Sequence, residues 1–285
     1  MLPVLLDLKF VKIYTFGVFL VLAFFWASFV LWRNIRLTSQ KEEEIFDGLF
    51  LALAAGLFFS RLVYVLLNFS KFGFSFLKVI LINGFPGLSL YGALFGCFLM
   101  LYLYFLLKKI KLNDLIDYFI PSAFIALAFG KLGSFFSGSE VGSQTKFFLA
   151  IKYFGYDGLR HLTPFYESIF FCLGALISYK LLFEIRKERF KRGFVFYFFC
   201  WYFALIYFLF DKMKINHLYF LGYNFNKIVS TVLVLTISVY FIYYFKNSIF
   251  HYGKAAYKKI TKKIGGGFGE RIKKTGKAYF RAKTK

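Results

Sequence analysis

Seven long apolar runs constrain what this chain can fold into more than any other feature of its sequence. A helix needs about 20 apolar residues to cross the hydrocarbon core of a bilayer, and the runs are close to that length. They cover residues 13–32, 46–68, 86–107, 115–138, 164–183, 194–211 and 218–245. We therefore predict an all-α polytopic membrane protein with about seven transmembrane helices.

The composition excludes the soluble classes of protein. Of the 285 residues, 59% are hydrophobic and only 18% are charged, whereas soluble domains carry roughly 25% charged residues. Intrinsic disorder is excluded by the same apolar content. The three cysteines, Cys97, Cys172 and Cys200, form no CxxC pair, so the sequence predicts neither a disulfide scaffold nor a metal site.

The distribution of Lys and Arg predicts the orientation. Basic residues are concentrated at Arg33–Lys41, in the turns 108–111 and 185–193, and in the tail after residue 245. Because cytoplasmic loops carry the excess of Lys and Arg, we expect the N-terminus outside and the C-terminus in the cytoplasm. The predicted domain is thus 1–245, with a short outer loop region at 139–163.

Residues 246–285 form a basic tail that accounts for much of the net charge of +23. We expect this tail to be cytoplasmic and held near anionic lipid, because it has the pattern of an interfacial amphipathic helix. Nucleic acid is the alternative partner for such a tail, and we do not expect it. A further short apolar stretch, 70–85, is followed by Pro86, and both an interfacial and a re-entrant placement remain open for it.

Four ionisable residues lie at membrane depth, where charged groups are costly and normally face a cavity or a partner. Arg61 lies in the second run and Lys131 in the fourth, while Glu167 opens the fifth run and Asp211 closes the sixth. Pairing for packing alone is the simpler interpretation of each residue. Taken together, Arg61 and Lys131 are expected to face one polar cavity, where two cations would attract an anionic headgroup.

Two glycine-rich stretches fall near these residues. Residues 130–142 carry four glycines at the end of the fourth run, and 84–92 carries three at the start of the third. Glycines at such places permit irregular backbone that lines a cavity. They equally permit close contact between helices, and the two interpretations remain open.

Four segments, in chain order, resemble motifs of the prolipoprotein diacylglyceryl transferases of bacterial inner membranes. The resemblance extends from about residue 13 to residue 245. The segments are GLFFSRLVYVL at 56–66, GLSLYGA at 87–93, DLID at 114–117 followed by Pro121 and GKLGSF at 130–135, and RHLTPFYE at 160–167. Each segment alone is a weak pattern, and their common order and spacing carry the resemblance.

The resemblance implies a reaction and its partners. The family transfers the diacylglyceryl group of phosphatidylglycerol to the lipobox cysteine thiol of a prolipoprotein and releases glycerol phosphate. The implied location is the bacterial cell (inner) membrane, in which the chain is multi-pass. The implied partners are phosphatidylglycerol, a prolipoprotein signal peptide with its lipobox cysteine, and membrane lipid. The sequence shows no nucleotide loop or metal-ligand spacing, and we expect no cofactor.

The resemblance also implies site residues. Lys131 and Arg61 would bind the phosphate, and Glu140 and Glu167 would orient those cations or hold the glycerol hydroxyls. The implied catalytic residues are Lys131, Tyr91, Glu140 and Asp211. The implied substrate-binding residues are Arg61, Lys131, Ser134, Gly142, Tyr166 and Glu167.

The chain departs from the family pattern by Phe16 for tyrosine, an extra residue before Glu140, a short loop at 139–163 and five further substitutions. Tyr91 stands where the family has histidine, and a tyrosine with a pKa of about 10 is a poor base at neutral pH. Lys131 replaces an arginine, which keeps the charge but loses the bidentate fork. The other departures are Ser134 for asparagine, Tyr207 for arginine and Asp211 for glutamate.

Three functions remain open at this point. The first is a divergent transferase that uses water or the substrate's own phosphate as proton acceptor. The second is a lipid-binding or scaffold protein that keeps the transferase fold without its activity. The third is a transporter of small anions, whose path buried cations can line, although no inverted repeat is visible in the sequence.

Overall fold

The computed structural model describes residues 2–8, 11–81, 84–153 and 155–246. The chain divides into two compact units, Met1–Leu235 and Thr236–Lys285, and the first contains the helices α1 to α8. The basic tail predicted at 246–285, with its amphipathic helix, lies outside the described residues except for Lys246.

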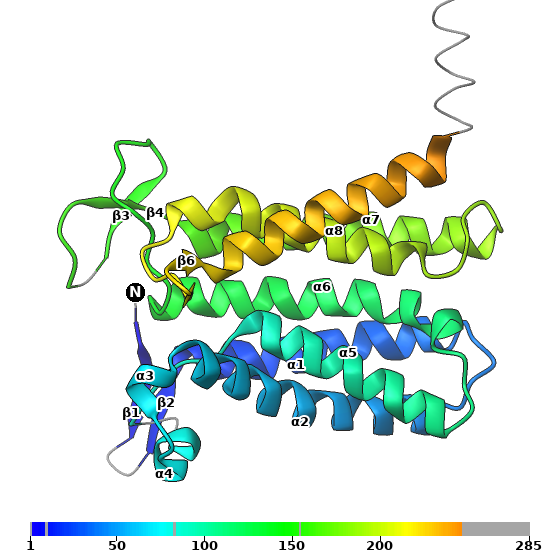
Figure 1. Ribbon diagram of the computed structural model, residues 1–285, viewed down its shortest axis with the longest axis horizontal. Helices are drawn as coiled ribbons and strands as arrows, with labels where there is room; N and C mark the ends of the chain where they lie inside the picture. Colours follow the sequence, from blue (N-terminus) through cyan, green and yellow to red (C-terminus); the bar gives the residue numbers. More distant parts are fainter. Residues whose placement is uncertain (1, 9–10, 82–83, 154, 247–285) are drawn as a thin grey trace, which may run out of the picture. The chain divides into compact units, whose positions relative to one another are not determined.

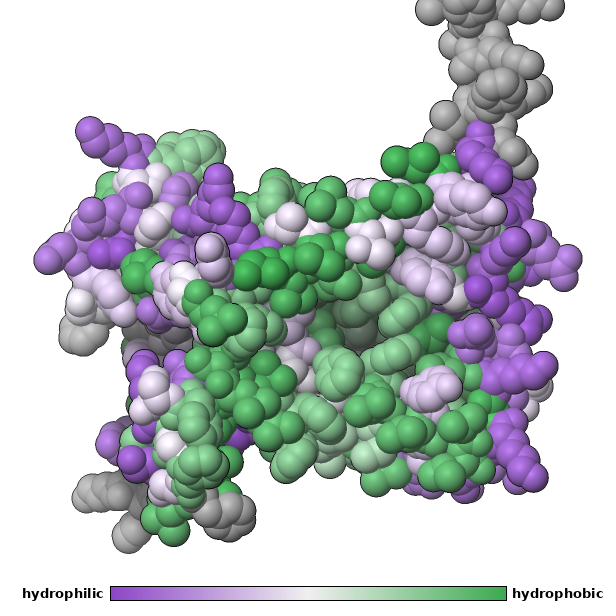
Figure 2. All heavy atoms as spheres, viewed as in Figure 1, coloured by the Kyte–Doolittle hydropathy of each residue, from purple (hydrophilic) through white to green (hydrophobic). Residues whose placement is uncertain are grey.

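Seven helices within the described residues are long and apolar enough to cross a membrane. They are α1 (Thr15–Ile35), α2 (Glu42–Leu67), α5 (Leu90–Leu107), α6 (Leu112–Ser137), α7 (Thr163–Arg186), α8 (Phe194–Phe210) and a last helix, Phe225–Lys246. Figure 2 shows hydrophobic side chains over the long helices and hydrophilic ones gathered at their ends. The prediction of a mostly helical protein with seven apolar spans is confirmed.

Helix α6 holds the bundle together. It packs against α1 on one side and against α7 on the other (Figure 1). Helix α2 pairs with α5, and α7 also contacts α8. Aromatic and aliphatic side chains fill the interior, as shown by Phe105, Leu115 and Phe124, which are at most 1% exposed. The cluster around Phe105 joins side chains of α1, α2, α5 and α6.

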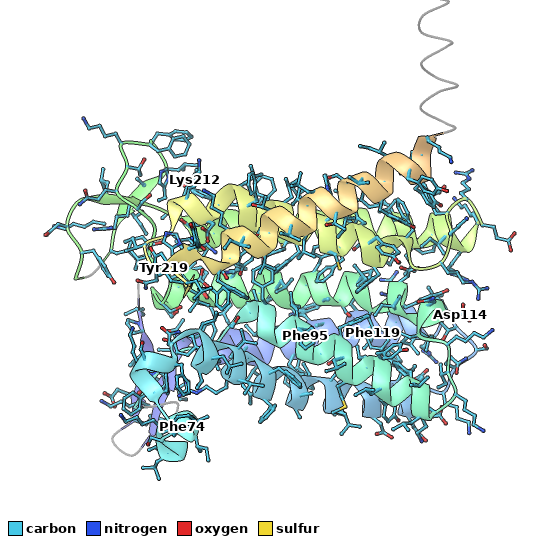
Figure 3. All side chains as sticks on the ribbon, viewed as in Figure 1. Phe74, Phe95, Asp114, Phe119, Lys212 and Tyr219 are labelled. Atoms are coloured by element: carbon cyan, nitrogen blue, oxygen red, sulfur yellow. The ribbon has the colours of Figure 1, made fainter. Side chains whose placement is uncertain are left out.

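The connections between helices sort into two ends of the first unit. The turns 36–41, 108–111 and 187–193 lie at one end. The described parts of the longer connections lie at the other end, at 68–81 and 84–89, 138–153 and 155–162, and 211–224 (Figure 1). Asp114 marks the first end, and Phe74, Lys212 and Tyr219 mark the second (Figure 3). The basic turns that predicted the orientation therefore share one end.

Three short antiparallel hairpins correct the all-α prediction. They pair β1 (Val4–Leu8) with β2 (Val11–Tyr14), β3 (Ala150–Lys152) with β4 (Leu159–His161), and β5 (Tyr219–Phe220) with β6 (Tyr223–Asn224). The last hairpin turns at Leu221 and Gly222, both with positive φ. That turn delays the last helix to Phe225, seven residues after the start of the apolar run that predicted it.

The short apolar stretch at 70–85 contains α3 (Phe69–Phe72) and α4 (Phe76–Ile80). Gly73 separates the two helices with φ +55, a conformation that glycine adopts without steric cost. Helix α5 then begins at Leu90, after an extended segment, and the Ser89 side chain caps it by accepting from the Gly92 N–H. The predicted third span therefore starts four residues late, because residues 86–89 form the approach to the helix and not its first turn.

Glycines let α2 and α5 approach closely. A Cβ added to Gly96 of α5 would lie 2.6 Å from the Phe59 Cβ and 2.8 Å from the Ala55 carbonyl oxygen, both on α2. A Cβ added to Gly92 would lie 2.7 Å from the Phe59 carbonyl oxygen. The backbones therefore touch where small residues face each other, which is the usual packing of membrane helices.

We predict that Gly96→Ala lowers the free energy of unfolding by about 1–3 kcal/mol, because overpacking outweighs the gain in helix propensity. Thermal unfolding in detergent measures the effect. Gly130→Ala on α6 is the matched control, since a Cβ there meets no described atom within 4 Å. Equal melting temperatures for the two variants would contradict the close α2–α5 contact.

Candidate functional site

Two lysines and two glutamates form an ion-pair cluster in which the Glu140 side chain is 37% exposed and the other three are at most 10% exposed. The Lys131 ammonium on α6 lies 2.7 Å from both carboxylate oxygens of Glu140 and 2.8 Å from the Glu167 Oε2 on α7. The Lys214 ammonium lies 2.5 Å from the Glu167 Oε1 and 3.8 Å from the Glu140 Oε2. We call Lys131, Glu140, Glu167 and Lys214 the four-charge cluster.

Backbone pairing after α6 and after α8 brings the cluster together. Gly142 and Lys214 form an antiparallel bridge, and the Ser143 N–H donates to the Met213 carbonyl at 2.7 Å. A Cβ at Gly142 would lie 2.3 Å from the His161 carbonyl oxygen, so this crossing requires glycine. The Thr163 hydroxyl at the start of α7 donates to the Met213 carbonyl. Three distant parts of the chain, 142–143, 161–163 and 213–214, are thereby held at one point.

Pairing makes these buried charges tolerable. The Glu167 side chain is fully buried, and the Lys131 and Lys214 side chains are 7% and 10% exposed. An isolated charge in such a place costs several kcal/mol of desolvation, which close opposite charges offset. Burial of the Glu140 carboxyl raises its pKa, but the Lys131 and Lys214 ammonium groups outweigh that effect and hold the pKa at about 2. The Glu140 carboxyl is therefore ionised at neutral pH, and the formal charges of two lysines and two glutamates sum to zero.

The two lysines differ in what they can still bind. An ammonium group has three N–H bonds, and Lys131 has three carboxylate oxygens within 2.8 Å. Among the described residues, only the Glu167 carboxylate lies within hydrogen-bonding distance of Lys214. Both ammonium groups also stand over the Tyr207 ring of α8, at 4.3 Å for Lys214 and 5.4 Å for Lys131. Lys214 is therefore the cation better placed to bind an anion.

A cavity of about 580 Å³ opens onto this cluster. Lys131, Glu140, Tyr207 and Lys214 line one part of its wall, and Tyr64 of α2 contributes to another. Its volume is within the range of about 300–1,000 Å³ found for small-molecule sites. Among the described residues no group of three or more His, Cys, Asp or Glu side chains is placed to hold a metal ion. The arrangement is suited to binding an anionic group beside ammonium donors.

Arg61 binds backbone carbonyl groups of the connection between α2 and α5, next to the cavity. Its buried guanidinium donates to four carbonyl oxygens at 2.7–2.9 Å, those of Lys78, Val79, Phe85 and Gly87. Gly87 lines the cavity, whereas Arg61 is not among its described lining residues. The expectation that Arg61 and Lys131 share one cavity is therefore not met by their side chains. Arg61 reaches the cavity wall through the backbone of Gly87.

Tyr91 and Asp211 lie beside the cluster without joining it. The Tyr91 hydroxyl is 2.5 Å from the Ser230 Oγ, and its ring meets the Tyr207 ring edge-on with centroids 5.6 Å apart. The buried Asp211 carboxylate accepts from the Asn224 amide at 2.5 Å and lies 3.5 Å from the His217 Nδ1. Both side chains therefore support the walls around Tyr207 and the segment 214–217.

The remaining predicted residues, Ser134, Gly142 and Tyr166, each make a different contact. The Ser134 hydroxyl donates to Glu140 at 3.4 Å and so belongs with the four-charge cluster. Gly142 contributes backbone at the crossing with Lys214. The Tyr166 hydroxyl donates to the Leu149 carbonyl at 2.6 Å and ties α7 to the outer loop region. The roles predicted for all of these residues in the reaction stay predictions.

Lys214 is the residue that the sequence analysis missed. The signal was present in the spacing, since Tyr207, Asp211 and Lys214 follow at i, i+4 and i+7, which places them on one helical face. Lys214 lies just beyond an apolar run, as the exposed Lys212 does, and a lysine at such a position is typical of the membrane interface. Only the fold separates these two lysines.

Comparison of the sequence with known proteins points to one family. The sequence model of the family "Prolipoprotein diacylglyceryl transferase" matches residues 3–243. The phosphatidylglycerol–prolipoprotein diacylglyceryl transferase of Clostridium tetani is 29% identical over 201 residues, which cover 69% of this chain and 78% of the relative. The protein of the same name from Listeria monocytogenes serotype 4a is 25% identical over 273 residues, which cover 92% and 96%.

We predict that Arg61→Ala and Arg61→Lys both destabilise the protein by about 2–5 kcal/mol. Each variant lacks the planar guanidinium, so buried carbonyl oxygens lose their hydrogen-bond donor. Thermal unfolding in detergent without added lipid measures this effect. Arg33→Ala, which removes one exposed bond to Tyr179, is the control and should change little. A stable Arg61→Lys variant that only binds phospholipid more weakly would instead favour the predicted role of Arg61 as a phosphate ligand.

Proposed function

The chain belongs to the prolipoprotein diacylglyceryl transferase family, and from that premise we propose that it transfers the diacylglyceryl group of phosphatidylglycerol to the lipobox cysteine of a prolipoprotein. The observation that carries the proposal is the Lys214 ammonium, which lines the cavity beside Lys131 and is braced by two glutamates. An enzyme that expels a phosphate from a phospholipid needs such fixed cations.

The reaction balances without a cofactor. The cysteine sulfur attacks the glycerol carbon that carries the phosphate ester, a carbon–sulfur bond forms, and the carbon–oxygen bond to phosphate breaks. Glycerol phosphate leaves with the bonding electrons, and the thiol loses its proton. The departing phosphate monoester, whose second pKa is about 6, can accept that proton in the end.

Lys214 and Lys131 would stabilise the charge that develops on this phosphate. Lys214 contacts the phosphate first, because it retains donor capacity toward the cavity. Lys131 shares its three N–H bonds between the phosphate and the carboxylates that now hold it. Glu140 and Glu167 keep both ammonium groups in position, so little reorganisation is needed when the charge appears.

The neighbouring residues would shape the substrate site. Ser134 holds Glu140, and the Gly142 crossing fixes Lys214. Asp211 orders the segment with His217 that forms another part of the cavity wall. Tyr166 ties α7 to the outer loop region, where the signal peptide would arrive. Tyr91 supports Tyr207 and through it the two ammonium groups.

The substitution at Tyr91 favours one alternative. Its hydroxyl is already bonded to Ser230, and no histidine is found at the position where the family carries one. A lipid-binding or scaffold protein with this fold would bind phosphatidylglycerol through Lys214 and Lys131 and yield no thioether product. An assay of lipid transfer separates this alternative from the enzyme, and flux of a small anion through proteoliposomes without lipid product would mark a transporter.

We predict that Lys214→Ala and Lys131→Ala each lower the rate of lipid transfer to a lipobox peptide by about 10²–10³-fold, the effect of removing one preorganised donor. The reaction is measured with phosphatidylglycerol in mixed micelles, and the thioether product is identified by mass spectrometry. Lys212→Ala, which removes an exposed lysine two residues away, is the matched control and should leave the rate unchanged.

Unchanged transfer by well-folded Lys214→Ala and Lys131→Ala variants would rule out this phosphate site. Tight binding of phosphatidylglycerol without any product, with several lipobox peptides, would replace the transferase by the lipid-binding alternative.

The proposed location is the bacterial cell (inner) membrane, with the N-terminus outside and the C-terminus in the cytoplasm. The support is the gathering of the basic turns 108–111 and 187–193 at one end of the first unit. We predict that a reporter enzyme that works only in the cytoplasm is active when it is fused after Lys285, and that a reporter that works only outside the membrane is inactive there. Activity of a reporter that requires the outer side of the membrane would reverse the orientation.

A further inference from the structure

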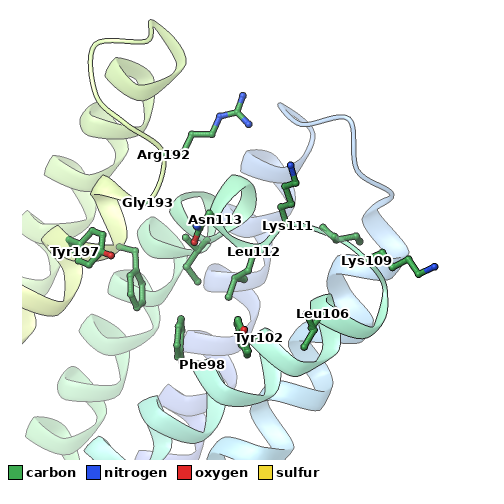
Figure 4. Close-up of a pocket in the computed structure, with 13 residues that line it drawn as sticks. Phe98, Tyr102, Leu106, Lys109, Lys111, Leu112, Asn113, Arg192, Gly193 and Tyr197 are labelled. Atoms are coloured by element: carbon green, nitrogen blue, oxygen red, sulfur yellow. The ribbon is translucent and has the colours of Figure 1, made fainter.

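A second cavity lies at the end of the first unit opposite the four-charge cluster. It has a volume of about 660 Å³ and opens between the α5–α6 turn and the start of α8 (Figure 4). Helix α6 contributes Leu112 to this cavity and Lys131 to the first one. At about 1.5 Å of rise per residue these two positions are roughly 28 Å apart, so no single headgroup reaches both.

The floor of this cavity is apolar and faces the lipid side of the bundle. Phe98 of α5 and Phe196 of α8 stack there with ring centroids 5.0 Å apart. Tyr102 and Leu106 continue the floor along α5, and they are 48% and 59% exposed. In the membrane such exposed surface on a spanning helix meets acyl chains. The cavity is therefore open sideways to lipid.

The rim of the same cavity is basic. Lys109, Lys111 and Arg192 line it, and Figure 4 shows Lys111 and Arg192 extending on the same side of the rim, beyond the side chains of Phe98 and Tyr102. Asp114 pairs with Arg192 at 2.7 Å. Within the described part of the chain, no carboxylate forms an ion pair with Lys109 or Lys111. The rim thus retains a net positive charge.

Two other acids lie near this rim without pairing with its lysines. Glu188 acts on Arg192 through space but forms no ion pair within the described part of the chain. The buried Asp117 carboxylate accepts from the backbone N–H groups of Gly193 and Phe196, at 2.5 and 3.0 Å. The Asp117 carboxylate therefore caps the N-terminus of α8 and forms no ion pair with the lysines of the rim. A ligand with a negative group and an apolar tail matches the rim and the floor together.

We propose that this cavity binds one anionic phospholipid of the adjacent leaflet, with its phosphate at Lys111 and Arg192 and one acyl chain along Phe98, Tyr102 and Leu106. Charge complementarity selects a headgroup of net negative charge, because a zwitterionic headgroup carries its own cation toward the rim. The sideways opening supplies the lipid directly from the bilayer. This site is separate from the proposed reaction and does not depend on it.

The test uses the full chain in mixed micelles with two photoreactive lipids. Phosphatidylglycerol and phosphatidylcholine carry the same diazirine-labelled acyl chain, and mass spectrometry maps the labelled residues. We expect labelling by phosphatidylglycerol within 98–113 and 193–197 to exceed labelling by phosphatidylcholine severalfold. Lys111→Ala combined with Arg192→Ala should reduce it about tenfold, since each cation near the membrane surface contributes to anionic lipid binding.

Lys146→Ala combined with Lys152→Ala is the matched control, because both lysines are exposed and lie in the outer loop region. This control, like Lys214→Ala, should leave labelling at the second cavity unchanged. Unlabelled phosphatidylglycerol should compete with the probe on the unmodified protein, which tests selectivity without any variant.

Equal labelling by the two lipids, equal competition by unlabelled phosphatidylcholine, or labelling that survives loss of both Lys111 and Arg192 would each overturn the proposal. The groove would then be ordinary lipid-facing surface. Labelling confined to the cavity at Lys214 would overturn it as well, while leaving the proposed transferase function untouched.

Discussion

The mutual neutralisation of Lys131, Lys214, Glu140 and Glu167 is the constraint on which the rest of the site depends. Glu167 has no exposure to solvent, and a carboxylate in that position is stable only when cations meet it closely. Those cations come from the end of α6 and from the segment after α8. The helices must therefore converge at this point, and the cavity walls follow from that convergence. Breaking one member leaves another charge buried and uncompensated.

The same cluster suits the chemistry proposed for it. Its formal charges sum to zero, so the cluster itself adds no net charge to the site. A phosphate that enters replaces carboxylate contacts at ammonium groups that are already in place, and the Tyr207 ring supports both of them. Lys131 was predicted to replace an arginine of the family pattern, and it offers a point charge in place of the planar fork. The glutamates supply the fixed geometry that lysine side chains lack on their own.

Arg61 shows how a buried cation can act on a site without lining it. Its four carbonyl acceptors belong to the connection between α2 and α5. That connection carries Gly87, whose φ of +148 and whose contact with the Tyr64 ring both require glycine. The guanidinium replaces the hydrogen bonds that regular secondary structure would have given this backbone. The guanidinium thereby ties the short helix α4 to the extended segment at Phe85 and Gly87, which has no helix or strand of its own.

Length and apolar character were enough to determine the seven spans, because a helix in a bilayer must satisfy its own backbone whatever surrounds it. The resemblance to the family motifs likewise predicted that Lys131, Glu140 and Glu167 belong to one site, because the segments around them follow in the order and spacing of the family. The pairing of Lys214 with Glu167, the acceptors of Arg61 and the partner of Tyr91 were decided only by the tertiary structure. Each of these contacts joins separate segments of the chain. A local sequence pattern does not show how close two such segments lie in space. The spacing placed Lys214 on one helical face with Tyr207 and Asp211, but only the crossing at Gly142 buries it, while Lys212 stays exposed.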